Sequence, residues 1–141
     1  NIRGLKRMAV DNAPANTVPV PEKAEATGKR IAIIGGGPSG LAAAYYLELM
    51  GHHAVVFEAK NKLGGMLRYG IPSYRFPRER LDQDIEAILS TGVEVHLNTK
   101  VGNGEGEVPF ISCAKNSTLF TLPSALTKIK KLASKAKIPK V

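Results

Sequence analysis

Between residues 29 and 101, the spacing of apolar positions changes repeatedly, and the changes predict strands and helices in alternation. A short continuous apolar run at 31–34 ends in glycines, which is typical of a strand buried on both faces of a parallel sheet. Residues 39–50 are rich in Ala and Leu and predict a helix, and 54–57 predict a second strand that ends at Glu58. Parallel strands need a crossover connection, which this helix supplies. We therefore predict an α/β fold built on a βαβ unit with a parallel sheet.

The same alternation continues beyond the second strand. One apolar face at helical spacing predicts a helix from about Pro77 to Thr91, and its members are Leu81, Ile85, Ile88 and Leu89. Alternating positions then predict a third strand with Val93, Val95 and Leu97 on one face. A glycine follows each helix, where a left-handed cap is favoured: Gly51 and Gly92. Residues 59–76 have no period, and we expect a long loop of functional importance.

The two ends of the chain have different patterns. Residues 1–28 are expected to form a short helix over 2–12 and then a Pro-rich linker. Residues 102–123 resemble nothing regular, and 124–137 could form a Lys-rich amphipathic helix. We therefore divide the chain into a helix and linker (1–28), a partial domain (29–101) and a basic tail of uncertain structure (102–141).

Charge is unevenly distributed along the chain. The 141 residues have a formal net charge of +8, and residues 101–141 contribute +5 of it, from seven Lys against Glu105 and Glu107. A basic tail can bind nucleic acid or an anionic membrane, but we favour a solvated end, because these lysines are not interleaved with aromatic rings. We expect neither a nucleic-acid nor a membrane partner.

A single cysteine, Cys113, limits the redox chemistry of the chain. It excludes an internal disulfide, a cysteine-ligated iron–sulfur cluster and a CxxC redox pair. A reducing, cytoplasmic location fits this composition, and no cluster of metal ligands is visible.

A glycine-rich turn joins the first strand to the first helix. Gly35 to Gly40 reads GGGPSG, a GxGxxG sequence. Gly35 permits the tight turn, Gly37 lets a pyrophosphate approach the backbone, and Gly40 lets the helix pack closely on the strand. The helix N-terminus offers N–H groups and a partial positive charge to phosphates. This arrangement predicts a dinucleotide-binding, Rossmann-like unit, against the alternative of a plain strand–helix turn.

Glu58 strengthens the dinucleotide interpretation. It closes the second strand 18 residues after Gly40, where a carboxylate can accept both ribose hydroxyls of an adenosine. The alternative is a solvated strand end. The motif alone does not separate FAD from NAD(P), because the adenosine half is the same in both.

The segment that follows Glu58 carries a more specific resemblance. The string LGGMLRYGIPSYRFP, residues 63–77, together with the glycine-rich turn and the second helix, resembles the FAD domain of the glutamate synthase small (beta) subunit family. The same module occurs in dihydropyrimidine dehydrogenase and related NADPH:ferredoxin-type flavoproteins. The resemblance covers residues 1–101 and implies FAD as the cofactor.

The resemblance implies roles for matching positions. The pyrophosphate would be held by Gly35, Gly36, Gly37, Pro38, Ser39 and Gly40. Glu58 would bind the adenosine ribose, Arg75 would reach the phosphates, and Val101 would meet the adenine through its backbone. The segment along the FAD would consist of Lys62, Leu63, Gly64, Gly65 and Met66. The alternatives without a cofactor are a simple turn at 64–65 and a surface cation at Arg75. Tyr69 and Tyr74 could stack on the flavin or only pack against the protein.

The family's reaction would require more than this chain contains. By resemblance, electrons pass from NADPH through FAD to 4Fe-4S clusters, and on to a large catalytic subunit or another electron-acceptor subunit. The NADPH domain and the cluster cysteines are absent from these 141 residues. Because the resemblance stops where the composition changes, we hypothesise a frameshift or truncation near residue 102, against a natural short variant. The competing function is a non-catalytic nucleotide-binding module that acts only through a partner subunit.

Overall fold

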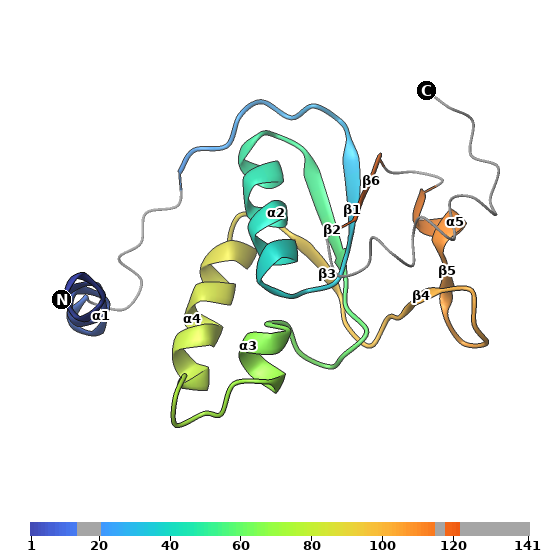
Figure 1. Ribbon diagram of the computed structural model, residues 1–141. Coiled ribbons are helices and arrows are strands. Elements are labelled where there is room, and N and C mark those ends of the chain that lie inside the picture. Colours follow the sequence, from blue (N-terminus) through green and yellow to red (C-terminus); the bar gives the residue numbers. More distant parts are fainter. Residues whose placement is uncertain (14–20, 115–117, 122–141) are drawn as a thin grey trace.

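A four-stranded parallel sheet organises the chain (Figure 1). The computed structural model describes residues 1–13, 21–114 and 118–121. The sheet has the order β3-β2-β1-β6, and its strands are β1 (Arg30–Ile34), β2 (His53–Phe57), β3 (Glu94–His96) and β6 (Thr118–Thr121). All three pairings are parallel, so the predicted α/β class and parallel sheet are confirmed.

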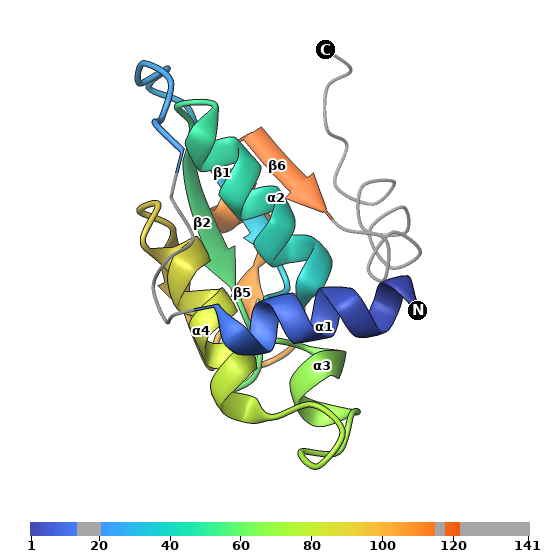
Figure 2. The same ribbon diagram turned by 90° about the vertical axis from the view of Figure 1, so that its left-hand side faces the viewer.

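Two helices cover one face of this sheet. They are α2 (Pro38–Leu49) and α4 (Arg78–Leu89), and Figure 2 shows them side by side in front of the strands. Helix α2 connects β1 to β2, as the crossover argument requires, and α4 precedes β3. The predicted bounds agree within a few residues; Pro77 is the N-cap of α4 instead of a member of its first turn.

The hydrophobic core lies between the sheet and these helices. Its buried members are Ile33, Leu41, Ala44, Ala54, Val56, Leu63, Leu81, Ile85 and Val93. The predicted apolar face of α4 is confirmed, because Ile88 and Leu89 pack against this cluster as well. Leu97 was expected on the inner face of the third strand, but it follows β3 and is exposed.

Glycines with positive φ follow both covering helices. Gly51 has φ +79° and Gly92 has φ +101°, which confirms the left-handed conformation expected at these positions. At Gly51 a Cβ atom would also collide with the Glu25 carbonyl of the linker. Glycine therefore ends the helix and lets the linker pass close to it.

Two stretches contain structure that the sequence pattern did not reveal. The expected loop 59–76 includes one helical turn, α3 (Met66–Tyr69). Residues 102–123 were expected to be irregular, but this was wrong for their described part, which contains β4 (Val101–Gly102), β5 (Val108–Pro109), α5 (Phe110–Ala114) and β6. These elements are too short to show a period, and β6 depends on its pairing with β1. The helix expected over 124–137 lies outside the described residues.

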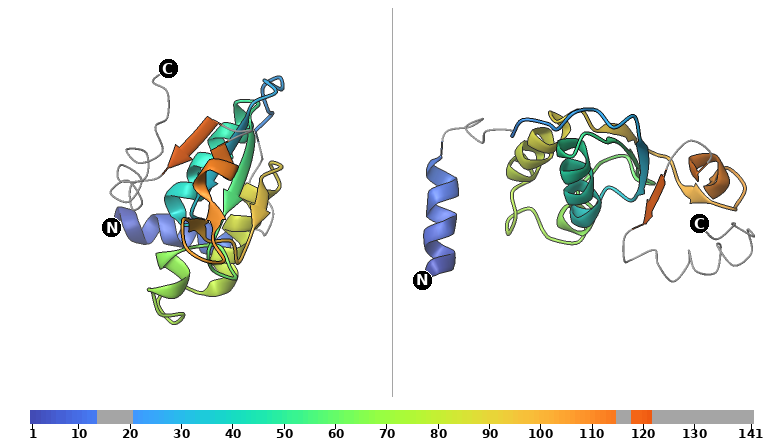
Figure 3. Two further views of the ribbon diagram at one scale, coloured as in Figure 1. Left: turned by 90° about the vertical axis from the view of Figure 1, so that its right-hand side faces the viewer. Right: turned by 90° about the horizontal axis from the view of Figure 1, so that it is seen from above.

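Of these late elements, β6 belongs to the main sheet, while α5, β4 and β5 lie on the side of the sheet opposite α2 and α4 (Figures 1 and 3). Figures 1 and 3 place α5 opposite α2 and α4, with β4 and β5 forming a separate two-stranded parallel sheet beside it. Helix α1 (Ile2–Asn12) confirms the helix expected over 2–12 and contacts α4 through Arg80. In the ranges described, no helix is long and apolar enough to cross a membrane.

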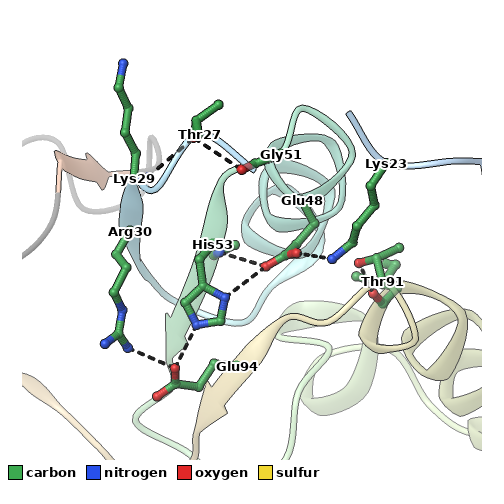
Figure 4. Close-up of polar contacts among 11 residues, drawn as sticks. Lys23, Thr27, Lys29, Arg30, Glu48, Gly51, His53, Thr91 and Glu94 are labelled. Atoms are coloured by element: carbon green, nitrogen blue, oxygen red, sulfur yellow. Dashed lines mark hydrogen bonds and ion pairs between the residues drawn. The ribbon is translucent and has the colours of Figure 1, made fainter. Parts of the chain in front are cut away.

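A buried carboxylate ties the linker to the amino-terminal edge of the sheet (Figure 4). The side chain of Glu48, at the end of α2, is only 3% exposed. Its Oε2 accepts a hydrogen bond from Lys23 Nζ at 2.5 Å, and its Oε1 accepts one from the Ala54 N–H at 2.8 Å. The pair therefore satisfies a buried charge and, at the same time, a buried backbone donor at the start of β2.

A second carboxylate, that of Glu94, has basic side chains from β1, β2 and β3 as its partners. Glu94 Oε2 lies 2.9 Å from Arg30 Nη2 and 3.0 Å from His53 Nε2, and Glu94 Oε1 lies 2.8 Å from His96 Nε2. Hydrogen bonding from His53, and then from His96, lowers the pKa of the Glu94 carboxyl below its ordinary value, with Arg30 acting in the same direction.

Replacing Glu48 by Ala should destabilise the chain. The substitution leaves the Ala54 N–H without its partner in a fully buried position, so we expect a loss of about 1–3 kcal/mol in the free energy of unfolding. Urea unfolding followed by circular dichroism measures this, since the chain has no Trp. Glu86→Ala, at an exposed position of α4, is the matched control. Equal losses in both variants would contradict the role given to Glu48.

Stability should decrease on acidification through Glu94. Because its folded-state pKa is lowered, its contribution is present above the ordinary glutamate pKa and is lost as the pH falls through the lowered value. Urea unfolding between neutral pH and pH 3 should therefore have a shallower pH dependence in Glu94→Gln than in the unaltered chain. Parallel curves for the two proteins would show that Glu94 is not linked to folding.

Candidate functional site

The glycine-rich turn lies at the carboxyl-terminal edge of the sheet, where β1 ends (Figure 1, below the strands). Gly35 has φ +106°, and its N–H donates to the Phe57 carbonyl at 2.8 Å, so the turn is tied to the end of β2. Gly37 is the N-cap of α2 and Pro38 follows in its first turn. No side chain caps this helix, and Ser39 is exposed while Gly40 is buried.

Glu58 and Gly36 lie in direct contact. The Gly36 N–H donates to Glu58 Oε2 at 2.7 Å, and the Lys60 N–H donates to Glu58 Oε1 at 2.8 Å. Glu58 is 9% exposed. An ionised carboxylate has about four acceptor positions, so each oxygen keeps capacity for one more donor.

The second glycine pair packs against the first turn. The Gly64 N–H donates to the Gly36 carbonyl at 2.8 Å. A Cβ atom built on Gly65 would lie 2.8 Å from Gly37 Cα, so the two backbones meet face to face. Gly64 and Gly65 also have positive φ, +113° and +51°. The structure thus brings the two glycine-rich segments together, and Leu63 is buried beneath them.

Two arginines that sequence reasoning missed hold this second segment. Arg68 Nε donates to the Leu63 carbonyl at 2.5 Å, and its Nη2 pairs with Asp82 of α4. Arg78 donates to the carbonyls of Leu67 at 2.6 Å and Ile71 at 2.5 Å. Neither arginine belongs to a recognisable motif, so only the folded chain reveals these contacts.

Other residues named from the sequence lie farther out. Lys62 and Arg75 are exposed, and Met66 is 73% exposed. The Arg75 N–H donates to the Pro72 carbonyl at 3.0 Å, and its guanidinium makes no hydrogen bond or ion pair with the described residues. Val101 lies in β4, outside the main sheet, and no hydrogen bond in the described ranges joins it to the glycine-rich turn.

The two tyrosines of this loop differ in their contacts. The Tyr69 hydroxyl donates to Asn61 Oδ1 at 2.9 Å, and Lys60 Nζ lies 3.9 Å from the centre of the Tyr69 ring. Tyr74 is 88% exposed. Tyr69 therefore packs within its own loop, while the ring of Tyr74 is open to solvent.

Metal and thiol chemistry receive no support from the described part of the chain. No group of three or more His, Cys, Asp or Glu residues there is placed to hold a metal ion. Cys113 is buried, and this burial raises the pKa of its thiol, which makes the thiolate scarce at neutral pH.

Some glycines of the two segments are required by their backbone conformation, and Gly37 is not. Gly35, Gly64 and Gly65 need φ values that other residues rarely adopt. Gly37 has φ −81°, and a Cβ atom there would meet only Gly65 Cα at an ordinary 3.9 Å. The described fold therefore does not require glycine at 37. An anion bound at the N-terminus of α2 would need the backbone to be bare and would supply a reason for glycine at 37.

Comparison with known proteins identifies the class of this domain. Residues 33–96 match the family model described as an NAD(P)-binding Rossmann-like domain. Among solved structures, Thermovibrio ammonificans THI4 covers 79% of this chain and 64% of its own, with 20% identity and a TM-score of 0.50. At that identity the likeness concerns the fold alone.

Three curated relatives are all NAD(P)-dependent oxidoreductases or subunits of them. The beta subunit of NADP(+)-dependent formate dehydrogenase from Moorella thermoacetica is 55% identical over 54% of this chain. Glutamate synthase (NADH) from Schizosaccharomyces pombe is 42% identical over 74%, and the glutamate synthase (NADPH) small chain from Mycobacterium tuberculosis is 42% identical over 54%. The chain spans only 11%, 5% and 16% of their respective lengths. The resemblance to glutamate synthase small subunits that was inferred from the sequence is confirmed.

Gly65→Ala and Gly37→Ala should have different effects on stability. At Gly65 the new Cβ meets backbone at 2.8 Å in a left-handed conformation, so we expect about 1–3 kcal/mol of destabilisation. At Gly37 the conformation is ordinary and a Cβ atom would make only an ordinary contact, 3.9 Å to Gly65 Cα, so we expect less than about 1 kcal/mol, the scale of an N-cap change. Urea unfolding followed by circular dichroism compares them, and a larger loss at 37 would refute this division.

Proposed function

Because this chain is a homologue of glutamate synthase small subunits and carries a Rossmann-like domain of the NAD(P)-binding class, we propose that it is the FAD-holding part of an NADPH-dependent oxidoreductase. The observation that carries the proposal is the contact between the two glycine-rich segments. The Gly64 N–H donates to the Gly36 carbonyl, and Gly65 packs directly against Gly37. A second backbone segment without side chains therefore lies beside the glycine-rich turn.

In this proposal the turn at 35–40 holds the pyrophosphate. The uncapped N-terminus of α2 offers N–H groups and the positive end of the helix dipole to it. A Cβ atom at Gly37 would meet only Gly65 Cα, at 3.9 Å, so the bare backbone leaves room for phosphate oxygens to approach. Ser39, exposed in the first turn, is available as a further hydrogen-bond donor.

Glu58 would select the adenosine ribose. The N–H groups of Gly36 and Lys60 fix its two oxygens, and each oxygen can accept one hydroxyl of a cis-diol. Because the carboxylate is held before any ligand arrives, binding does not need to order it. A phosphorylated 2′-hydroxyl would meet a negative charge there, which disfavours NADPH at this position.

The flavin half would extend along residues 62–66. Leu63 and Gly64 are buried beneath the turn, while Met66 and Tyr74 expose apolar surface that an aromatic ring system could cover. Arg75 presents a solvent-facing cation without a partner in the described residues, which suits the phosphates. Val101 is assigned to the adenine, and this assignment rests on the family resemblance alone.

The bound FAD would supply two-electron acceptance and one-electron transfer, and this chain would position it. NADPH and 4Fe-4S clusters would be bound by other parts of the assembly. We propose a large catalytic subunit or another electron-acceptor subunit as the partner, since the chain corresponds to a small part of its relatives. A cytoplasmic location belongs to the same proposal, because a single cysteine fits a reducing compartment.

A second candidate is a pyridine-nucleotide site, and the description of the matching family model favours it. NAD(H) has the same adenosine half and would use the same turn and Glu58. The two candidates differ beyond the pyrophosphate, because only FAD brings an isoalloxazine ring to residues 62–66. A chain that binds either nucleotide but transfers no electrons would be the non-catalytic module that works through its partner.

FAD should bind the purified chain, and Gly37→Glu should abolish binding. A carboxylate in the open space before Gly37 would occupy and repel the phosphate position, whereas the fold has room there for a first side-chain atom. Visible absorption after gel filtration with FAD, and fluorescence titration with NADH and NADPH, measure the three affinities. The control is Gly28→Glu, which adds the same charge away from the turn, where a Cβ atom meets nothing within 4 Å. Because Gly28 has φ +70°, any backbone strain falls on the control, which makes it the stricter comparison.

Each result has a defined meaning. FAD retained by the unaltered chain and by Gly28→Glu, but not by Gly37→Glu, supports the proposal. Tight NADH binding without FAD binding would replace it by the pyridine-nucleotide site. Binding of neither nucleotide would leave the partner-dependent module as the function.

A further inference from the structure

The segment that faces the phosphate turn is held through three successive carbonyls. Arg68 Nε donates to Leu63 O at 2.5 Å, Leu67 N–H donates to Gly64 O at 3.1 Å, and Arg68 N–H donates to Gly65 O at 3.0 Å. Arg68 thus binds both ends of this tripeptide, once with its side chain and once with its backbone. The carbonyls of 63–65 are directed toward α3.

The same guanidinium reaches the helical layer. Arg68 Nη2 pairs with Asp82 of α4, and the Arg68 side chain is only 9% exposed. Leu81 and Ile85, the neighbours of Asp82 on α4, belong to the core cluster beneath the sheet. A continuous series of contacts therefore joins the core, Asp82, Arg68 and the backbone of 63–65.

Arginine suits this position better than lysine does. Its planar guanidinium offers donors in different directions, so Nε can serve a carbonyl while Nη2 serves a carboxylate. A lysine ammonium is a point charge on a flexible stem and would serve the two partners less well. The space is also narrow, since a Cβ atom on Gly64 would lie 3.2 Å from Arg68 Cβ.

We propose that Arg68, paired with Asp82, is a positioning residue that sets how closely residues 63–65 approach the phosphate turn, and with it the fit of the dinucleotide. This inference rests on the proposed function, because it concerns the same cradle. Arg68 itself is buried behind the segment, so it acts through the backbone of Leu63 to Gly65. Its loss would loosen the Gly64–Gly36 hydrogen bond that closes the two segments on one another.

The test uses the full chain and two independent readouts. The first is the FAD dissociation constant, measured by flavin fluorescence titration. The second needs no cofactor: NMR hydrogen exchange of the Gly64 amide, compared with amides of β1. The variants are Arg68→Met, which keeps the stem and removes the donors, Arg68→Lys, which keeps the charge, and Asp82→Asn, which keeps the shape. Arg80→Met is the matched control, because Arg80 lies in α4, is partly exposed and has a long ion pair, 3.8 Å, with Asp11.

For Arg68→Met we expect FAD binding to weaken about tenfold to a hundredfold, as for the loss of a buried charge-assisted hydrogen bond. Exchange of the Gly64 amide should accelerate about tenfold or more, while exchange in β1 stays unchanged. Arg68→Lys should recover part of the loss, and Asp82→Asn should change both readouts in the same direction by less. Arg80→Met should change neither.

The opposite results are equally clear. Unchanged FAD affinity in Arg68→Met, with FAD bound by the unaltered chain, overturns this inference and leaves the proposed function standing. Uniform acceleration of exchange, β1 included, would show that Arg68 only stabilises the fold. If Arg68→Met does not fold, Arg68→Lys and Asp82→Asn decide the matter by the same criteria. Failure of the unaltered chain to bind FAD overturns the proposed function and the role of Arg68 toward the cofactor together.

Discussion

The parallel pairing of β1 with β2 is the constraint on which the rest of the structure depends. Parallel neighbours place their carboxyl ends at the same edge, so the turn at 35–37 and Glu58 meet although 22 residues separate Gly36 from Glu58. The pairing also demands a crossover, and α2 supplies it with its N-terminus at that edge. The N-terminus of α2, the glycine-rich turn and the Glu58 carboxylate therefore lie together as a consequence of the strand pairing alone.

The amino-terminal and carboxyl-terminal edges of the sheet each carry a buried carboxylate, and the two carboxylates have different kinds of partner. Glu48, at the amino-terminal edge, is in contact with Lys23 and the Ala54 N–H, so its charge is balanced within the fold. Glu58, at the carboxyl-terminal edge, accepts two backbone N–H groups. The Glu48 carboxylate is paired with a lysine and fixes the linker. The Glu58 carboxylate is held by backbone donors alone, so its oxygens can still accept hydrogen bonds from a ligand.

The glycine-rich segments illustrate a comparable division. At Gly65 the protein's own backbone disfavours a side chain, because Gly37 Cα lies only 2.8 Å from the position that a Cβ would take. At Gly37 nothing in the described fold does so, and the proposed pyrophosphate would supply a reason for glycine there. Packing of one segment on the other makes the edge a surface of backbone atoms, which is the kind of surface that approaches phosphates most closely.

What the sequence determined by itself is the set of elements whose signals are local. Periodicity located α2, α4 and the first three strands, and the glycine spacing with Glu58 located the candidate site, because both depend on residues near in the chain. Only the tertiary structure revealed β6, which exists as a partner of β1, and the contacts of Arg68 with Leu63 and Asp82. A four-residue strand is too short to show a hydrophobic period, so the local sequence does not predict β6. The partners of a long arginine side chain depend on which residues the packed core places near it, so the local sequence does not predict them either.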